Sequence, residues 1–170
     1  MADTNDTLSG DESLHLPEFD SPPADPMPLL KGWLVRAQAD GVREPLAASL
    51  ATAGPQDADG PAIPSTRVVL VKAFDERGLI FGTYTSSRKG RDLAANPYAA
   101  LGFYWRETMQ QLRVEGTVEL LAADESAALF ADRPRAAQAT TAASRQGQPL
   151  PDEGALVAEA TALAEGSRAS

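Results

Sequence analysis

The sequence predicts a mainly β fold with flanking helices, in which about five mainly antiparallel strands form a small barrel. The first observation is a series of short apolar runs between positions 46 and 121, separated by turn residues. The second is that helical patterns lie before and after this series, with one short helix inside it. The third is size, because 170 residues, 43% of them hydrophobic, suit one domain with one core. Barrel closure is expected because it removes unpaired strand edges.

The chain begins with an acidic segment, residues 1–26, that holds seven acids and no Lys or Arg. Few apolar residues accompany these charges, so the segment is predicted to be a disordered tail. From Pro26 onward, apolar residues recur at spacings of three and four, which predicts an amphipathic helix that ends at Gly41. The folded domain is therefore expected to span residues 27–170.

The remaining elements follow in order along the chain. Apolar runs bounded by turn residues predict strands at 46–53, 65–74, 79–85, 98–105 and 109–121. A polar turn joins the second of these strands to the third and predicts a hairpin. A short helix is expected before Asn96 and Pro97, between the third and fourth strands. Ala-rich stretches predict three more helices, at 124–132, 136–145 and 153–165.

Composition excludes several kinds of chemistry. The chain has no Cys, so disulfides, thiolate nucleophiles and Cys-ligated metals are excluded. Its one His, His15, lies in the acidic segment, which argues against a Ser-His-Asp triad or a His-rich metal site. Most of the net charge of −9 falls on that segment, and the nearly neutral remainder argues against nucleic-acid binding. No leader or membrane span is recognised, so a cytoplasmic protein is expected, and any enzymatic chemistry is expected to come from a cofactor.

The segment from Thr85 to Gly90, at the start of the short internal helix, favours a phosphate site. Its hydroxyls, its two adjacent cations Arg88 and Lys89, and the free N–H groups of a helix start together suit a phosphate dianion. A capped helix with solvated charges explains the same residues equally well. The segment therefore indicates a phosphate site without deciding for it.

A second motif is an apolar strand with a cation at each end, Arg67 and Lys72. Cations on a core strand cost desolvation free energy unless an anion or a polar ligand pairs with them. Strict alternation places these two residues on opposite faces, so a bulge is needed for both to contact one molecule. Cations that reach water at the strand ends are the alternative. Gln111, whose carboxamide can donate and accept at the edge of a heterocycle, is a third candidate beside ordinary surface polarity.

The ordered set of motifs resembles the FMN-dependent pyridoxamine 5′-phosphate oxidase family over most of residues 27–150. The matching residues are Arg67-Val68-Val69-Leu70-Val71-Lys72, Gly82-Thr83, Ser87-Arg88-Lys89-Gly90, Asn96-Pro97, Gln111 and Arg133-Pro134-Arg135. The resemblance implies a split β-barrel homodimer that binds FMN between its subunits and acts on a small-molecule substrate. It assigns FMN contacts, with Arg88 and Lys89 at the phosphate, to Arg67, Val68, Val69, Leu70, Lys72, Gly82, Thr83, Arg88, Lys89, Gln111 and Gln146. It names no catalytic side chain and no metal.

Departures from the family pattern bear on the substrate. Members that act on pyridoxamine phosphate have hydroxyl side chains where this chain has Leu129 and Ala137, which leaves Lys72 and Arg133 to bind the substrate. The segments 43–45, 104–108 and 143–146 look more like the phenazine-biosynthesis branch of the family.

The resemblance therefore implies an oxidase that transfers a hydride from a dihydrophenazine carboxylate to the flavin and then to O₂. The first alternative is the pyridoxine/pyridoxamine 5′-phosphate oxidase itself. The second is an inactive flavin-binding module, because the family's C-terminal segment is not recognised before Ser170. The third is a split-barrel reductase with another flavin-like cofactor.

Overall fold

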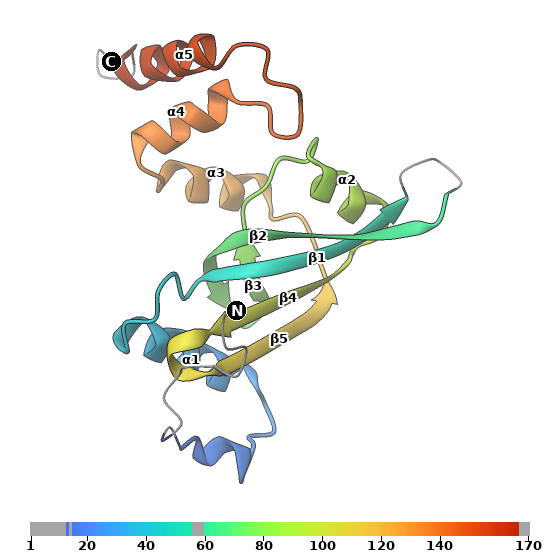
Figure 1. Ribbon diagram of the computed structural model, residues 1–170, viewed down its shortest axis with the longest axis vertical. Helices are drawn as coiled ribbons and strands as arrows, with labels where there is room; N and C mark the ends of the chain where they lie inside the picture. The colour runs from blue at the N-terminus through green and yellow to red at the C-terminus, as the bar shows by residue number, and fades with distance from the viewer. Residues whose placement is uncertain (1–12, 14, 56–59, 167–170) are drawn as a thin grey trace, which may run out of the picture.

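Five antiparallel strands form one curled sheet in the computed structural model, which describes residues 13, 15–55 and 60–166 (Figure 1). The strands are β1 (Ala47–Pro55), β2 (Ala62–Asp75), β3 (Gly78–Phe81), β4 (Tyr98–Trp105) and β5 (Gln110–Thr117). Their order in the sheet is β3-β2-β1-β4-β5, so β3 and β5 lie at the edges. The predicted antiparallel β class is confirmed, and the described strands form a curled half-barrel rather than a closed barrel.

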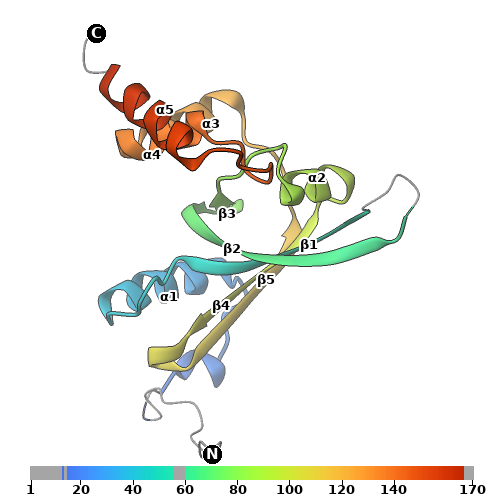
Figure 2. The same cartoon turned by 45° about the horizontal axis from the view of Figure 1, so that its top comes forward.

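The helices surround the two ends of this sheet. They are α1 (Met27–Ala39), α2 (Arg88–Ala95), α3 (Ala123–Ala131), α4 (Arg135–Ala143) and α5 (Glu153–Gly166), with 3₁₀ turns at η1 (Pro17–Phe19) and η2 (Arg106–Thr108). Both views place α3, α4 and α5 together near α2, while α1 lies at the other end of the sheet (Figure 1 and Figure 2). Within the described residues, none of these helices is long and apolar enough to span a membrane.

The core lies between α1 and the inner face of the sheet. Alternation along β2 buries Val69 and Val71 and exposes Val68 and Leu70, as period-two side chains require. The other elements contribute deeply buried side chains to this core, namely Leu34, Leu50, Phe103 and Trp105. The predicted helix at the start of the domain is confirmed, because four apolar residues of α1 are buried at helical spacing.

The last part of the predicted acidic tail packs against α1. Leu16 is buried, and the indole N–H of Trp33 donates to a Glu18 carboxylate oxygen. Phe19 meets the Trp33 ring edge-on, with 5.7 Å between the ring centroids. The expectation of a tail that reaches residue 26 is therefore wrong for this stretch, whereas residues 1–12 lie outside the described part of the chain.

The turn between β2 and β3 is tied to α3. Arg77 donates to a carboxylate oxygen of Asp75 and to one of Glu125, both at 2.8 Å. The guanidinium holds the pKa of both carboxyl groups below their ordinary values. This ion-pair cluster links the predicted hairpin to the C-terminal helices.

A register shift interrupts the β2–β3 pairing at Lys72. Val71 pairs with Phe81, whereas Ala73 pairs with Ile80, so Lys72 is the extra residue of an irregular step. The sequence required such a bulge if Arg67 and Lys72 were to contact one molecule. The structure supplies the irregularity at the position of Lys72.

Candidate functional site

The entry into α2 is built as a tight capped turn. Ser87 is the N-cap, and its hydroxyl accepts a hydrogen bond from the Gly90 N–H at 3.3 Å. A Cβ at Gly90 would lie 2.4 Å from the carbonyl oxygens of Tyr84 and Thr85, so only glycine lets the helix start this close to the loop that follows β3. This turn carries Lys89 into the interior of the protein.

Lys89 is a buried cation with neutral partners. The residue is 8% exposed, and its ammonium donates to Gln146 Oε1 at 2.8 Å and to Ser87 Oγ at 3.4 Å. Burial, with a smaller contribution from nearby Arg67, lowers the pKa of Lys89 below its ordinary value. Lys89 forms no ion pair with a carboxylate in the described part of the chain. A buried cation without a counter-ion favours an anionic ligand.

Arg67 reaches the same region from β2. One terminal nitrogen donates to Thr52 Oγ1 at 2.7 Å and to the Ser65 carbonyl at 3.0 Å, and the other donates to Ser65 Oγ at 2.9 Å. A carboxylate oxygen of Asp92 on α2 lies 3.5 Å from the second nitrogen. These contacts fix the guanidinium where β1, β2 and α2 meet.

Four of the residues predicted to contact FMN are thus brought together around the start of α2, and one of them, Lys89, was predicted at its phosphate. Arg67 and Lys89 supply charge, and Gln146 reaches in from the loop after α4. Thr83 lies beside the N-cap, with its hydroxyl 3.2 Å from Ser87 Oγ. Cations, hydroxyls and a carboxamide in one place can bind a phosphate ester through charge-assisted hydrogen bonds. We call Arg67, Thr83, Ser87, Lys89 and Gln146 the phosphate cluster.

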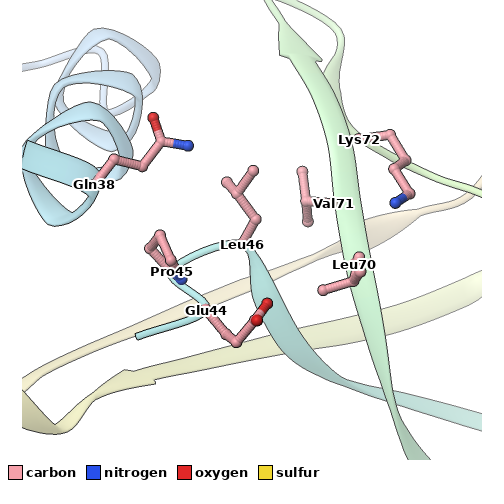
Figure 3. Close-up of a pocket in the computed structure, with 7 residues that line it drawn as sticks. All are labelled: Gln38, Glu44, Pro45, Leu46, Leu70, Val71 and Lys72. Atoms are coloured by element: carbon pink, nitrogen blue, oxygen red, sulfur yellow. The ribbon is translucent and has the colours of Figure 1, made fainter. Parts of the chain in front are cut away.

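Lys72 lies apart from these contacts, at a second site. It lines an open pocket of about 280 Å³ that is formed by Gln38, Glu44, Pro45, Leu46, Leu70, Val71 and Lys72. Leu46 and Val71 lie next to each other between Gln38 on α1 and Lys72 on β2 (Figure 3). The loop that carries Glu44 is held in place because the Trp105 indole N–H donates to the Pro45 carbonyl at 3.0 Å. The pocket therefore has an apolar floor with charged and amide groups at its edge.

The other predicted site residues are spread around these two locations. Val69 is buried in the core, and Arg133 lies 5.9 Å from the centroid of the Phe130 ring. Gln111 pairs with Tyr104 across β4 and β5, with its side chain exposed. The remaining predicted residues are exposed, namely Val68, Leu70, Gly82 and Arg88.

Sequence reasoning missed Thr52 and Asp92. The Thr52 hydroxyl donates to Asp92 at 2.7 Å, although forty positions separate the two residues in the sequence. Asp92 follows Lys89 by three positions, so the helical period places both on one face of α2. This spacing was the available signal for Asp92, whereas Thr52 carries none. No group of three or more acidic or His side chains in the described residues could hold a metal ion.

Several known proteins are similar to this chain in sequence. A family model described as pyridoxamine 5′-phosphate oxidase matches residues 34–165. The dihydrophenazinedicarboxylate synthase of Pseudomonas chlororaphis is 38% identical over 161 residues, which cover 95% of this chain and 70% of that protein. The pyridoxine/pyridoxamine 5′-phosphate oxidase of Burkholderia multivorans is 46% identical over 150 residues, which cover 88% and 67% respectively.

Two solved structures have a similar fold. PhzG from Burkholderia lata 383, solved in complex with tetrahydrophenazine-1-carboxylic acid, is similar with a TM-score of 0.84 and 40% identity. The match covers 91% of this chain and 74% of that one. A pyridoxamine 5′-phosphate oxidase-related, FMN-binding protein from Nostoc punctiforme shares the fold, with a TM-score of 0.63 and 23% identity over 79% of this chain and 72% of that one.

Proposed function

This chain belongs to the pyridoxamine 5′-phosphate oxidase family, and from that premise we propose that it is an FMN-dependent oxidase of reduced phenazine carboxylates. Bound FMN supplies a hydride acceptor and a route for electrons to O₂. The chain's own residues bind and orient the cofactor and the substrate. The observation that carries the cofactor assignment is Lys89 in the phosphate cluster, which is buried and has no carboxylate partner among the described residues.

The residues present fit the phosphate of FMN. A phosphate dianion beside Lys89 and Arg67 would offset the desolvation that lowers the pKa of Lys89. The Thr83 hydroxyl and the amide N–H groups of Gln146 can donate further hydrogen bonds to it. Arg88, exposed at the start of α2, is proposed as a further phosphate contact. The flavin ring contacts proposed from the family pattern are Val68, Val69, Leu70, Lys72, Gly82 and Gln111.

The substrate is proposed from the pocket at Lys72 and from residues of the helices that follow β5. The apolar floor of the pocket suits a flat ring system, and the Lys72 ammonium suits a carboxylate on that ring. Leu129 and Ala137 offer no hydroxyl to a substrate phosphate, so Arg133 is proposed as the second anion contact. The similarity to a structure that holds tetrahydrophenazine-1-carboxylic acid supports this ligand class.

The test is oxygen consumption by the FMN-loaded protein. Reduced phenazine-1-carboxylate is compared with pyridoxamine 5′-phosphate and pyridoxine 5′-phosphate, with free FMN as the control for uncatalysed oxidation. Faster turnover of the phenazine substrate is the expected result. Efficient turnover of the vitamin B6 substrates alone would overturn the substrate assignment.

A pyridoxine/pyridoxamine 5′-phosphate oxidase is the second candidate function. It is favoured by identities of 45–46% to such enzymes from Nitrobacter winogradskyi and Burkholderia multivorans. The same assay decides between the two substrates. Tight FMN binding without turnover of any of them would indicate a flavin-binding module, and competition against FMN tests for another flavin-like cofactor.

We also propose that the working form is a homodimer. The outer face of the sheet exposes Val68, Leu70 and Tyr104, at 68%, 43% and 50%. The residues of this face between β2 and β4 are small: Ser49 on β1 pairs with Val68 on one side and with Gly102 on the other. A second copy of this chain would remove these apolar side chains from water. Light scattering during size-exclusion chromatography tests this, with twice the mass of one chain as the expected result and the monomer mass as the contrary one.

A further inference from the structure

Asp92 places a buried carboxylate next to the phosphate cluster. Its side chain is 7% exposed, and one carboxylate oxygen accepts from Thr52 Oγ1 at 2.7 Å and lies 3.5 Å from an Arg67 nitrogen. A Cβ at Gly54 would lie 2.7 Å from the Asp92 Cα, so glycine on β1 is what allows α2 to approach this closely. The position of the carboxylate is thus set by the packing of α2 on β1.

Thr52 joins the two charged groups through one hydroxyl. The Thr52 oxygen accepts a hydrogen bond from the Arg67 guanidinium, and the Thr52 O–H donates one to the Asp92 carboxylate. Arg67 and Asp92 are therefore connected twice, by charge and through Thr52. Asp92 is the only carboxylate that pairs with Arg67 in the part of the chain that the structure describes.

The charges around this network do not balance without a further anion. Arg67 and Lys89 lie close enough for their positive charges to oppose each other, and each is largely withdrawn from water. The Asp92 carboxylate compensates one of the two cations. A buried charge that loses its compensation is costly, so Asp92 stabilises the protein when no ligand anion is present.

We propose that Asp92 is an internal counter-ion that competes with the ligand phosphate for Arg67, and so determines how strongly FMN is preferred over riboflavin. This inference rests on the proposed FMN function. When a phosphate dianion enters the cluster it meets the attraction of Arg67 and Lys89 and also the repulsion of Asp92. The Asp92 carboxylate thereby stabilises the flavin-free chain and lowers its affinity for phosphate.

The experiment compares the flavin-free 170-residue chain with its Asp92→Asn variant. Asn keeps an oxygen that can accept from Thr52 but removes the negative charge. FMN is expected to bind about three- to tenfold more tightly to the variant, with riboflavin affinity unchanged, both measured by quenching of flavin fluorescence. The flavin-free variant is expected to unfold at a lower temperature than flavin-free wild type. Added FMN is expected to raise the unfolding temperature of the variant by more than it raises that of wild type.

The control is Asp75→Asn, which makes the same change in net charge at the exposed turn beside Arg77. It is expected to leave the preference for FMN over riboflavin unchanged. A merely structural role for Asp92 would weaken both flavins equally. Asp92→Ser removes the same charge with less bulk, and is expected to shift the preference in the same direction if the Asn variant does not fold.

Inorganic phosphate is the second probe and needs no flavin. At matched ionic strength, it is expected to raise the unfolding temperature of Asp92→Asn by more than that of wild type. An equal or smaller rise, or an unchanged or weaker FMN preference, would overturn the role of Asp92. Wild-type protein that binds neither flavin would instead refute the proposed FMN function. The phosphate measurement would still test whether Asp92 opposes anion binding.

Discussion

Replacing Lys89 by Met is expected to weaken FMN binding while it stabilises the flavin-free protein. Met keeps an unbranched apolar chain in a position that is 8% exposed, and removes an ammonium group whose pKa is lowered by burial. The partners left behind lose little. Ser87 Oγ still donates to the Tyr84 carbonyl at 2.8 Å, and Gln146 is exposed to water.

The size of the effect on binding follows from the contact that is lost. A hydrogen bond between charged groups contributes about 1.5–3 kcal/mol, which corresponds to a rise of about 10- to 150-fold in the Kd for FMN. Riboflavin lacks the phosphate, so its affinity is expected to change little. The ratio of the two Kd values therefore isolates the phosphate contact.

The pH dependence of stability has a definite sign. Because the pKa of Lys89 is lower in the folded chain than its ordinary value of 10.5, the unfolded chain binds this proton more strongly. The lysine's contribution to the unfolding free energy of wild type then rises with pH between the folded pKa and 10.5. Lys89→Met is expected to lose this rise.

Flavin fluorescence titration and urea unfolding at several pH values measure both effects. The conservative variant Lys89→Arg, which keeps the charge, serves as the control for binding and is expected to retain part of the FMN preference. An FMN affinity for Lys89→Met within twofold of wild type would refute the assignment of Lys89 to the phosphate.

Three further changes test the fold around the site. Gly90→Ala places a Cβ 2.4 Å from the Tyr84 carbonyl oxygen, so a large drop in unfolding temperature is expected by calorimetry, and a wild-type value would contradict the tight turn. Leu50→Ala empties a fully buried position and is expected to cost about 2–5 kcal/mol in urea unfolding, whereas a loss below about 1 kcal/mol would place Leu50 outside the core. Arg77→Gln removes the cation that lowers the pKa of Asp75 and Glu125. Their contribution to stability is present above the ordinary carboxyl pKa values and is lost as pH falls through the lowered ones, so acid unfolding of this variant is expected to depend less steeply on pH.

The strands could be predicted from the sequence because their alternation and turns are local. The fourth strand, predicted at 98–105, has these bounds in the structure, and the others are shifted by a few residues. The largest shifts are at the C-terminal ends of β5, predicted at 109–121 but ending at Thr117, and of β3, predicted at 79–85 but ending at Phe81. Beyond that residue the chain turns toward the capped start of α2, and this turn depends on tertiary contacts of Tyr84 with the C-terminal helices.

The phosphate cluster was predictable only in its local part. The pattern from Ser87 to Gly90 indicates a helix start with cations, and the structure buries Lys89 there. Sequence could not assign the neutral partner of Lys89, because Gln146 lies fifty-seven positions away. The predicted roles of these residues in binding FMN stay predictions.

The packing of the segment around Leu16 was missed for a similar reason. Acidic and polar residues dominate residues 1–26, so composition predicts too little apolar surface to fold alone. In the structure, Leu16 joins the buried core that includes Trp33, and Phe19 meets the Trp33 ring edge-on while it stays mostly exposed. A segment that packs against a later helix cannot be recognised as ordered from its own composition.

The strand order has a consequence for how the chain folds. β1–β2 and β4–β5 are each formed by neighbours in sequence, whereas β1 and β4 join through residues as distant as Ser49 and Gly102. Closing so long a loop is the slow, entropically costly step of such a topology. Thr52 lies on β1 where it joins β4, and Asp92 lies on the helix inside the loop. We therefore expect the network that holds Arg67 to be completed only once that helix packs against β1, so that the proposed phosphate site would be one of the last features of the chain to form.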